Sequence, residues 1–128
     1  TKTMDNAVQA VRPGGVCIVA AECSDMREPW EFFGWFERPT VEEMDFGLRS
    51  NYTIAGWVAM TVREFCRTGP IILLTRPENA AFARQAGLIP AATIEEALGK
   101  ARELCGRPDP TITIMPNGAN TLPILKAR

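Results

Sequence analysis

The first candidate for chemistry is a polar cluster, Glu22-Cys23-Ser24-Asp25, that directly follows an apolar run at residues 16–21. Glu22 and Asp25 are carboxylates, which serve as proton donors and acceptors in general acid–base catalysis. Surface loops are often acidic for solvation alone, so the cluster equally fits a loop without catalytic function. Cys23 has no adjacent Lys or His that would activate it as a nucleophile.

Two further polar segments follow other apolar runs. Thr75 ends the run at 71–75, and Asn117 and Asn120 follow the run at 111–115. Ligands of open α/β sheets bind at the carboxyl ends of the strands, so these segments predict one shared polar crevice. Its candidate residues are Glu22, Ser24, Asp25, Thr75, Asn117 and Asn120. The alternative is purely local, with Thr75 as a helix cap and Asn117-Gly118 as a turn pair.

The sequence contains no His, which removes His-based triads, His metal ligands and imidazole pH switches from this chain. Its cysteines lack the spacing of zinc and thioredoxin-type motifs; they are Cys17, Cys23, Cys66 and Cys105. No Gly-x-Gly-x-x-Gly or Walker pattern occurs, so classical nucleotide binding is not supported. We therefore expect this chain alone to bind neither a metal nor a cofactor.

Strands and helices must position these residues. Apolar runs at 16–21 and 71–75 predict strands that are buried on both faces. The alternating run at 111–115 predicts a third, wetter strand, and residues 88–92 are a candidate for an additional one. Strands separated by helices predict an α/β fold in residues 1–128. The expected domain is a three-layer helix–sheet–helix arrangement with a mostly parallel sheet, Rossmann-like or flavodoxin-like in the broad sense.

Helical spacing of apolar residues marks the intervening segments. Met4, Ala7, Val8 and Val11 predict a first helix that ends before Pro13-Gly14-Gly15. Residues 29–67 are helical in three pieces, the first opened by Pro29. Two capping boxes, Thr40–Glu43 and Thr93–Glu96, mark helix starts farther along the chain.

Five aromatic residues within seven positions cannot all face one side of a helix; they are Trp30, Phe32, Phe33, Trp35 and Phe36. We expect most of them in the core and one or two in contact with a partner domain or subunit, and a homo-oligomer is compatible with such a surface. Trp57 belongs to the apolar stripe of the segment 54–67, so we expect it in the core.

Length and charge restrict the classes of partner. The chain has 128 residues, 46% hydrophobic and 23% charged, which suits one globular domain. Its 14 basic and 15 acidic residues give a net charge of −1, so neither nucleic acid nor a membrane is an expected partner. The low Cys content and the lack of a visible signal peptide favour the cytoplasm. Because the sequence starts with Thr1, inside a predicted helix, we expect it to be a piece of a longer protein.

The order of several motifs resembles the C-terminal domain of the nickel-dependent lactate racemase family. A helix begins near Lys2, Val-Arg-Pro-Gly-Gly-Val follows at 11–16, and the next strand ends in Ala-Glu-Cys at 21–23. Thr-Ile-Glu-Glu-Ala-Leu at 93–98 and Met-Pro-Asn-Gly-Ala-Asn-Thr-Leu-Pro at 115–123 fit the same domain. The resemblance spans about residues 2–123, and the order and spacing of the motifs carry it.

The resemblance implies racemisation or epimerisation of a 2-hydroxy acid by hydride transfer with a nickel-pincer nucleotide. It also implies an active site between two domains, with the nickel-ligating and acid–base His residues in an N-terminal domain that this chain lacks. Lys2 matches a family Lys at a helix start and would orient the substrate carboxylate, although a frayed surface Lys is the simpler interpretation. The chain departs from the family where Ser24-Asp25-Met26-Arg27 replaces a Gly-containing loop.

Two other classes of function remain open. The chain fits a non-catalytic α/β module that binds a small molecule in the same crevice. It also fits an assembly module that acts through the aromatic segment. If the resemblance holds, the chain alone is inactive and forms one wall of a site completed by the missing domain.

Overall fold

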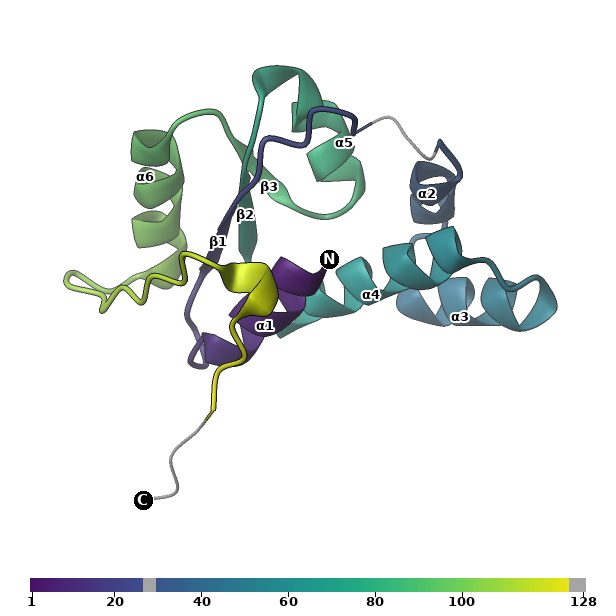
Figure 1. Cartoon of the computed structure of the whole chain (residues 1–128), viewed down its shortest axis with the longest axis horizontal. Helices are drawn as coiled ribbons and strands as arrows, with labels where there is room; N and C mark the ends of the chain where they lie inside the picture. The colour runs from purple at the N-terminus through teal and green to yellow at the C-terminus, as the bar shows by residue number, and fades with distance from the viewer. Residues whose placement is uncertain (27–29, 125–128) are drawn as a thin grey trace.

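The computed structural model describes residues 1–26 and 30–124 as an α/β fold built on a three-stranded parallel sheet (Figure 1). The strands are β1 (Cys17–Ala20), β2 (Ile71–Leu74) and β3 (Ile89–Ala91), and they lie in the order β1-β2-β3. Cys17 pairs with Ile71, and Ile72 pairs with Ile89. The predicted parallel sheet is confirmed, and so is the additional strand within residues 88–92.

The helices fill the segments between the strands. They are α1 (Lys2–Ala10), α2 (Trp30–Gly34), α3 (Val41–Ser50), α4 (Ile54–Thr68), α5 (Ala80–Gln85) and α6 (Ile94–Cys105), with short 3₁₀ turns η1 (Trp35–Glu37), η2 (Pro77–Asn79) and η3 (Gly118–Asn120). The helix starts that both capping boxes predicted are confirmed, since the Thr40 and Thr93 hydroxyls accept hydrogen bonds from the Glu43 and Glu96 backbone N–H groups. Pro29 lies outside the described residues. No helix in the described ranges has the length and apolar character needed to cross a bilayer.

The sheet is covered on both faces, which gives the predicted three layers. On one face, Cys17, Val19, Ile71 and Leu73 belong to the larger core, with which α1, α4 and α5 pack. On the other face, Ile72 and Ala91 pack with Ala97 of α6. Strand residues alternate between the two faces, so β2 is buried on both sides and anchors the domain. Figure 1 shows α6 alone on its side of the sheet.

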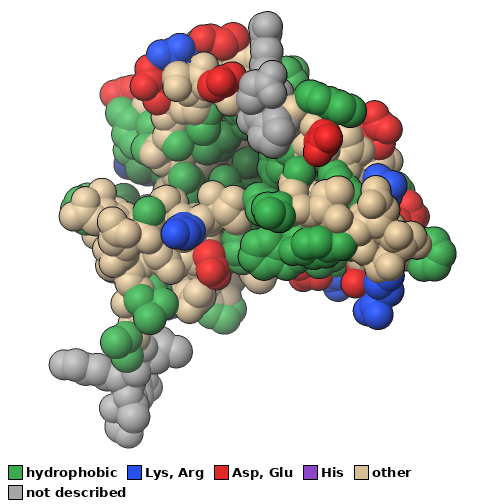
Figure 2. All heavy atoms as spheres, turned by 45° about the vertical axis from the view of Figure 1, so that its right-hand side comes forward, with side chains coloured by type: hydrophobic (Ala, Val, Ile, Leu, Met, Phe, Trp, Pro, Cys, Tyr) green, Lys and Arg blue, Asp and Glu red, His purple; other side chains and the backbone are tan. Residues whose placement is uncertain are grey.

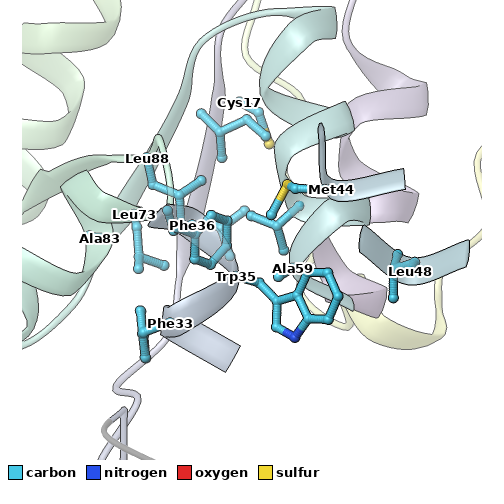
Figure 3. Close-up of a cluster of buried hydrophobic side chains, with 14 residues drawn as sticks. Cys17, Phe33, Trp35, Phe36, Met44, Leu48, Ala59, Leu73, Ala83 and Leu88 are labelled. Atoms are coloured by element: carbon cyan, nitrogen blue, oxygen red, sulfur yellow. The ribbon is translucent and has the colours of Figure 1, made fainter. Parts of the chain in front are cut away.

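The aromatic segment supplies much of the larger core. Phe33, Trp35 and Phe36 are buried, whereas Trp30 is 73% exposed. Figure 3 shows the Trp35 ring beside Ala59 of α4. A Cβ atom on Gly56 would lie 2.3 Å from Cε2 of Trp35, so this close approach requires glycine.

The packing of Trp35 also sets the orientation of α4. The buried line of this helix runs through Gly56, Ala59 and Val62. The expectation that Trp57 lies in the core was therefore wrong, because this side chain is 49% exposed and Ile54 beside it is 73% exposed. The apolar stripe correctly predicted a helix here, but the side of α4 that faces the core is the one on which Gly56 contacts Trp35.

The predicted strand at 111–115 was wrong. These residues form no strand, and Ile112 and Ile114 are 63% and 80% exposed. Prolines at 108, 110 and 116 flank the segment and cannot donate backbone hydrogen bonds to a sheet. The segment instead leads to η3, which packs against α1 on the larger-core side of the domain (Figure 1).

Candidate functional site

Two buried polar side chains organise the carboxyl ends of β1 and β2. Thr75 and Asn79 are only 7% and 6% exposed. The Thr75 hydroxyl donates to the Glu22 carbonyl oxygen at 3.0 Å. Nδ2 of Asn79 donates to the Cys23 carbonyl at 2.9 Å and to Oγ1 of Thr75 at 3.1 Å, with a longer contact of 3.3 Å to the Glu22 carbonyl. The loop after β1 is thus tied to the loop after β2.

This tie holds an unfavourable backbone conformation. Cys23 has φ of 50°, in the left-handed region that residues with a Cβ atom rarely adopt. Its carbonyl is the one that Asn79 binds at 2.9 Å. The side-chain amide therefore stabilises a sharp bend directly after the strand.

The charged side chains beside this bend form ion pairs with one another. Arg76 forms an ion pair with Glu22, and Glu78 lies 4.0 Å from Arg76. The hydrogen bond to Glu22 raises the pKa of the Arg76 guanidinium, which is charged in any case. A shallow hollow of about 550 Å³ lies between these loops; its lining is Ala20, Ala21, Glu22, Leu74, Thr75, Arg76, Pro77 and Ala92. Most of the residues that line this hollow are apolar, and its two charged side chains, Glu22 and Arg76, already pair with each other.

The structure places only part of the predicted crevice here. Glu22 and Thr75 come together, and beside them lie Arg76 and Asn79, which belong to the predicted polar segment 75–79 but were not singled out as candidates. Both follow β2 directly, so the strand-end argument applied to them as well. Thr75 is not a helix cap, because Arg76 precedes η2 and the Thr75 hydroxyl binds Glu22 instead. Ser24 and Asp25 lie exposed in the turn that follows.

Asn117 and Asn120 lie elsewhere, because no strand precedes them. They belong to the turn around η3, in which the Asn117 carbonyl accepts hydrogen bonds from Asn120 N at 2.8 Å and from the Thr121 hydroxyl at 2.9 Å. This turn packs against α1. Nδ2 of Asn6 donates to the Gly118 carbonyl at 2.8 Å.

Lys2 lies in the first turn of that same helix and is exposed. It is not among the residues that line the hollow at the strand ends. The predicted crevice is therefore divided, and the polar residues discussed here fall into two clusters. One is the strand-end cluster of Glu22, Thr75, Arg76 and Asn79, and the other is the α1 cluster of Lys2, Thr3, Asn6, Asn117, Gly118 and Asn120.

Comparison with known proteins identifies the domain. A family model described as the lactate racemase C-terminal domain matches residues 1–122 of the 128. The chain belongs to this family. The lactate racemase of Thermoanaerobacterium thermosaccharolyticum is 25% identical over 126 residues, a match that covers 94% of this chain and 29% of that protein.

The fold agrees with the family assignment. The solved structure of the lactate racemase apoprotein from Thermoanaerobacterium thermosaccharolyticum matches with a TM-score of 0.71 and 28% identity, over 80% of this chain and 26% of that chain. The predicted resemblance and fold class are both confirmed. This chain spans less than a third of the length of these relatives, so it corresponds to one part of such an enzyme.

The described residues contain no cluster of metal-binding side chains. Within residues 1–26 and 30–124, no three Cys, Asp or Glu side chains are grouped so that they would hold a metal ion, and the sequence has no His. All four cysteines are free thiols, and burial raises the pKa of the Cys17 and Cys66 thiols, which disfavours the thiolate that metals bind.

Proposed function

We propose that this chain is the substrate-side domain of a 2-hydroxy-acid racemase or epimerase and forms one wall of an active site between two domains. The observation that carries the proposal is the match to the lactate racemase C-terminal domain over residues 1–122. The shorter span of this chain relative to the racemase supports a second domain that completes the site. On this proposal the chain alone is inactive.

The residue that we propose for substrate binding is Lys2. Lys2 is exposed on the helix α1. A carboxylate placed there would receive a charge-assisted hydrogen bond from the ammonium group. Asp5, on the same helix, binds Nε2 of Gln9 at 3.1 Å.

The resemblance implies a nickel-pincer nucleotide in the full-length protein. The residues of this domain do not fit a nickel centre, because the described ranges contain no suitable group of ligands. We propose that another part of the polypeptide holds the cofactor, and that the contribution of this domain is confined to the substrate.

An exposed apolar surface supports contact with the rest of such a protein. On the face shown in Figure 2, hydrophobic side chains gather near the centre and to its right, while many of the charged side chains lie toward the edge of the view. Ile54 and Trp57 of α4, which packs beside α1, are among the exposed large hydrophobic residues. Exposed apolar patches of this kind mark interaction surfaces.

Replacement of Lys2 tests the proposal. In the full-length protein that contains this chain, we expect Lys2→Ala to raise the KM for lactate about tenfold to a hundredfold, since one charge-assisted hydrogen bond is lost. The matched control is Lys100→Ala, because Lys100 binds Glu96 at 2.6 Å on the helix that covers the other face of the sheet. Equal KM values for Lys2→Ala and the unaltered protein would contradict the role of Lys2.

The same exposed residues favour one alternative, an assembly module. If α4 mediates self-association, the isolated chain sediments as a concentration-dependent oligomer, and Trp57→Ser reduces the association constant. A monomer that binds only the remainder of the racemase polypeptide would favour the interdomain proposal.

A further inference from the structure

The turn around η3 packs on α1, the helix that carries Lys2. Nδ2 of Asn6 donates to the Gly118 carbonyl at 2.8 Å across 112 positions of sequence. Gly118 is buried, and a Cβ atom built on it would lie 2.8 Å from Cγ2 of Thr3. The turn therefore sits against both Thr3 and Asn6, and a side chain at 118 would force Thr3 to shift.

No side chain of α1 is fully buried, and its apolar residues are only partly buried against the larger core. The contacts of Thr3 and Asn6 with the η3 turn therefore add to the packing that holds this helix in place. Both residues lie in the part of α1 that also carries Lys2.

The position of Lys2 depends on this turn. Side chains four residues apart lie on the same side of a helix, so Lys2 projects one turn before Asn6, next to the contact with Gly118. We propose that the η3 turn, through Gly118 and Asn6, is a latch that holds the Thr3–Asn6 part of α1 in place and so positions Lys2 for the substrate carboxylate. This inference rests on the proposed function of Lys2. Asn6 and Gly118 are positioning residues, since they act through Lys2.

The test combines two variants and a rescue in the full-length protein. Gly118→Ala introduces the clash with Thr3, and Asn6→Ala removes the hydrogen bond to the turn. We expect each to accelerate hydrogen exchange at the amides of residues 5–7 and to raise the KM for lactate about threefold to tenfold, with a smaller change in kcat. Adding Thr3→Ala to Gly118→Ala removes the clashing methyl group and should restore both values.

Matched controls separate positioning from general damage. Gly99→Ala is the control for Gly118→Ala, because a Cβ atom on Gly99 meets nothing within 4 Å. Gln9→Ala is the control for Asn6→Ala, because Gln9 is exposed on the same helix and binds only Asp5 among the described residues. Both controls should leave exchange at residues 5–7 and KM unchanged. A merely structural defect would lower the active fraction, and hence kcat, without a change in KM.

The outcomes distinguish the latch from the function on which it rests. Unchanged exchange at residues 5–7 in both variants would overturn the latch. Faster exchange with an unchanged KM would also overturn it if Lys2→Ala raises KM in the same assay. If Lys2→Ala itself leaves KM unchanged, the proposed function of Lys2 fails, and the positioning role fails with it, whatever the exchange data show.

Discussion

The two polar clusters of this domain use similar residues to opposite effect. In the strand-end cluster, the amide of Asn79, the hydroxyl of Thr75 and the charges of Glu22 and Arg76 bind one another or nearby backbone. In the α1 cluster, the amide of Asn6 is used in the same way. The Lys2 ammonium group has no ion-pair partner within the described ranges.

This difference separates structural polarity from polarity that a ligand can use. Buried polar groups are costly unless they are paired, so Asn79 and Thr75 are best explained by the stability of the loops that they join. An exposed cation without an internal partner costs little to keep and is available for a carboxylate. The comparison therefore predicts that changes in the strand-end cluster lower stability, whereas changes at Lys2 alter substrate binding.

Asn79→Ala should have the largest effect on stability. It removes the donor that binds the Cys23 carbonyl at 2.9 Å and leaves the left-handed backbone at Cys23 without support. Losing a buried amide that serves several acceptors should cost about 2–3 kcal/mol in the free energy of unfolding. Urea unfolding followed by circular dichroism measures it, with the exposed Asn120→Ala as control. A cost equal to that of the control would show that the strand-end cluster is not structural.

Thr75→Val should cause the next largest loss in the free energy of unfolding. Valine keeps the shape of the side chain but removes the donor to the Glu22 carbonyl and one acceptor of Asn79. Asn79 retains its bond to Cys23, so the expected loss is about 1–1.5 kcal/mol. The double variant with Asn79→Ala should lose less than the sum of the two single changes, because they share one network. Strict additivity in urea unfolding would argue against that network.

Much of the framework could be predicted from the sequence, because its signals are local. The apolar runs at β1 and β2 and the capping boxes at Thr40 and Thr93 depend on neighbouring residues, and each proved correct. The segment at 111–115 has the alternation of a strand, yet its prolines and its connection to η3 keep it out of the sheet. Whether an extended segment pairs depends on contacts that a local pattern does not contain.

The candidate site was only partly predictable for the same reason. Glu22 and Thr75 were placed together correctly, because strand ends of a parallel sheet meet at one edge. The contact between Asn6 and Gly118 joins residues 112 positions apart, and no spacing rule indicates it. Lys2 came from the family resemblance, and the exposed position on α1 is consistent with that assignment without testing it.

Cys23→Gly should raise the free energy of unfolding, by less than Asn79→Ala or Thr75→Val lowers it. Glycine adopts φ of 50° without a steric penalty, so relief of strain should outweigh the added freedom of the unfolded chain. We expect a gain of about 0.5–1 kcal/mol in urea unfolding. Cys105→Ser, at a cysteine far along the chain, controls for loss of a thiol. A destabilised Cys23→Gly variant would mean that the thiol contributes packing that exceeds the backbone strain.

Arg76→Ala should have the smallest effect, although Arg76 forms the closest ion pair in the strand-end cluster. Both partners are largely exposed, with side-chain exposures of 43% and 67% for Arg76 and Glu22. Solvent screens such pairs, and ordering two long side chains offsets the attraction. The urea midpoint should therefore stay within error of the unaltered chain at both low and high salt. A marked, salt-sensitive loss would move Glu22 and Arg76 into the structural set with Asn79. An unchanged midpoint together with altered lactate kinetics would instead show that Glu22 and Arg76 contact the substrate. Substrate binding would then belong to both polar clusters and not to Lys2 alone.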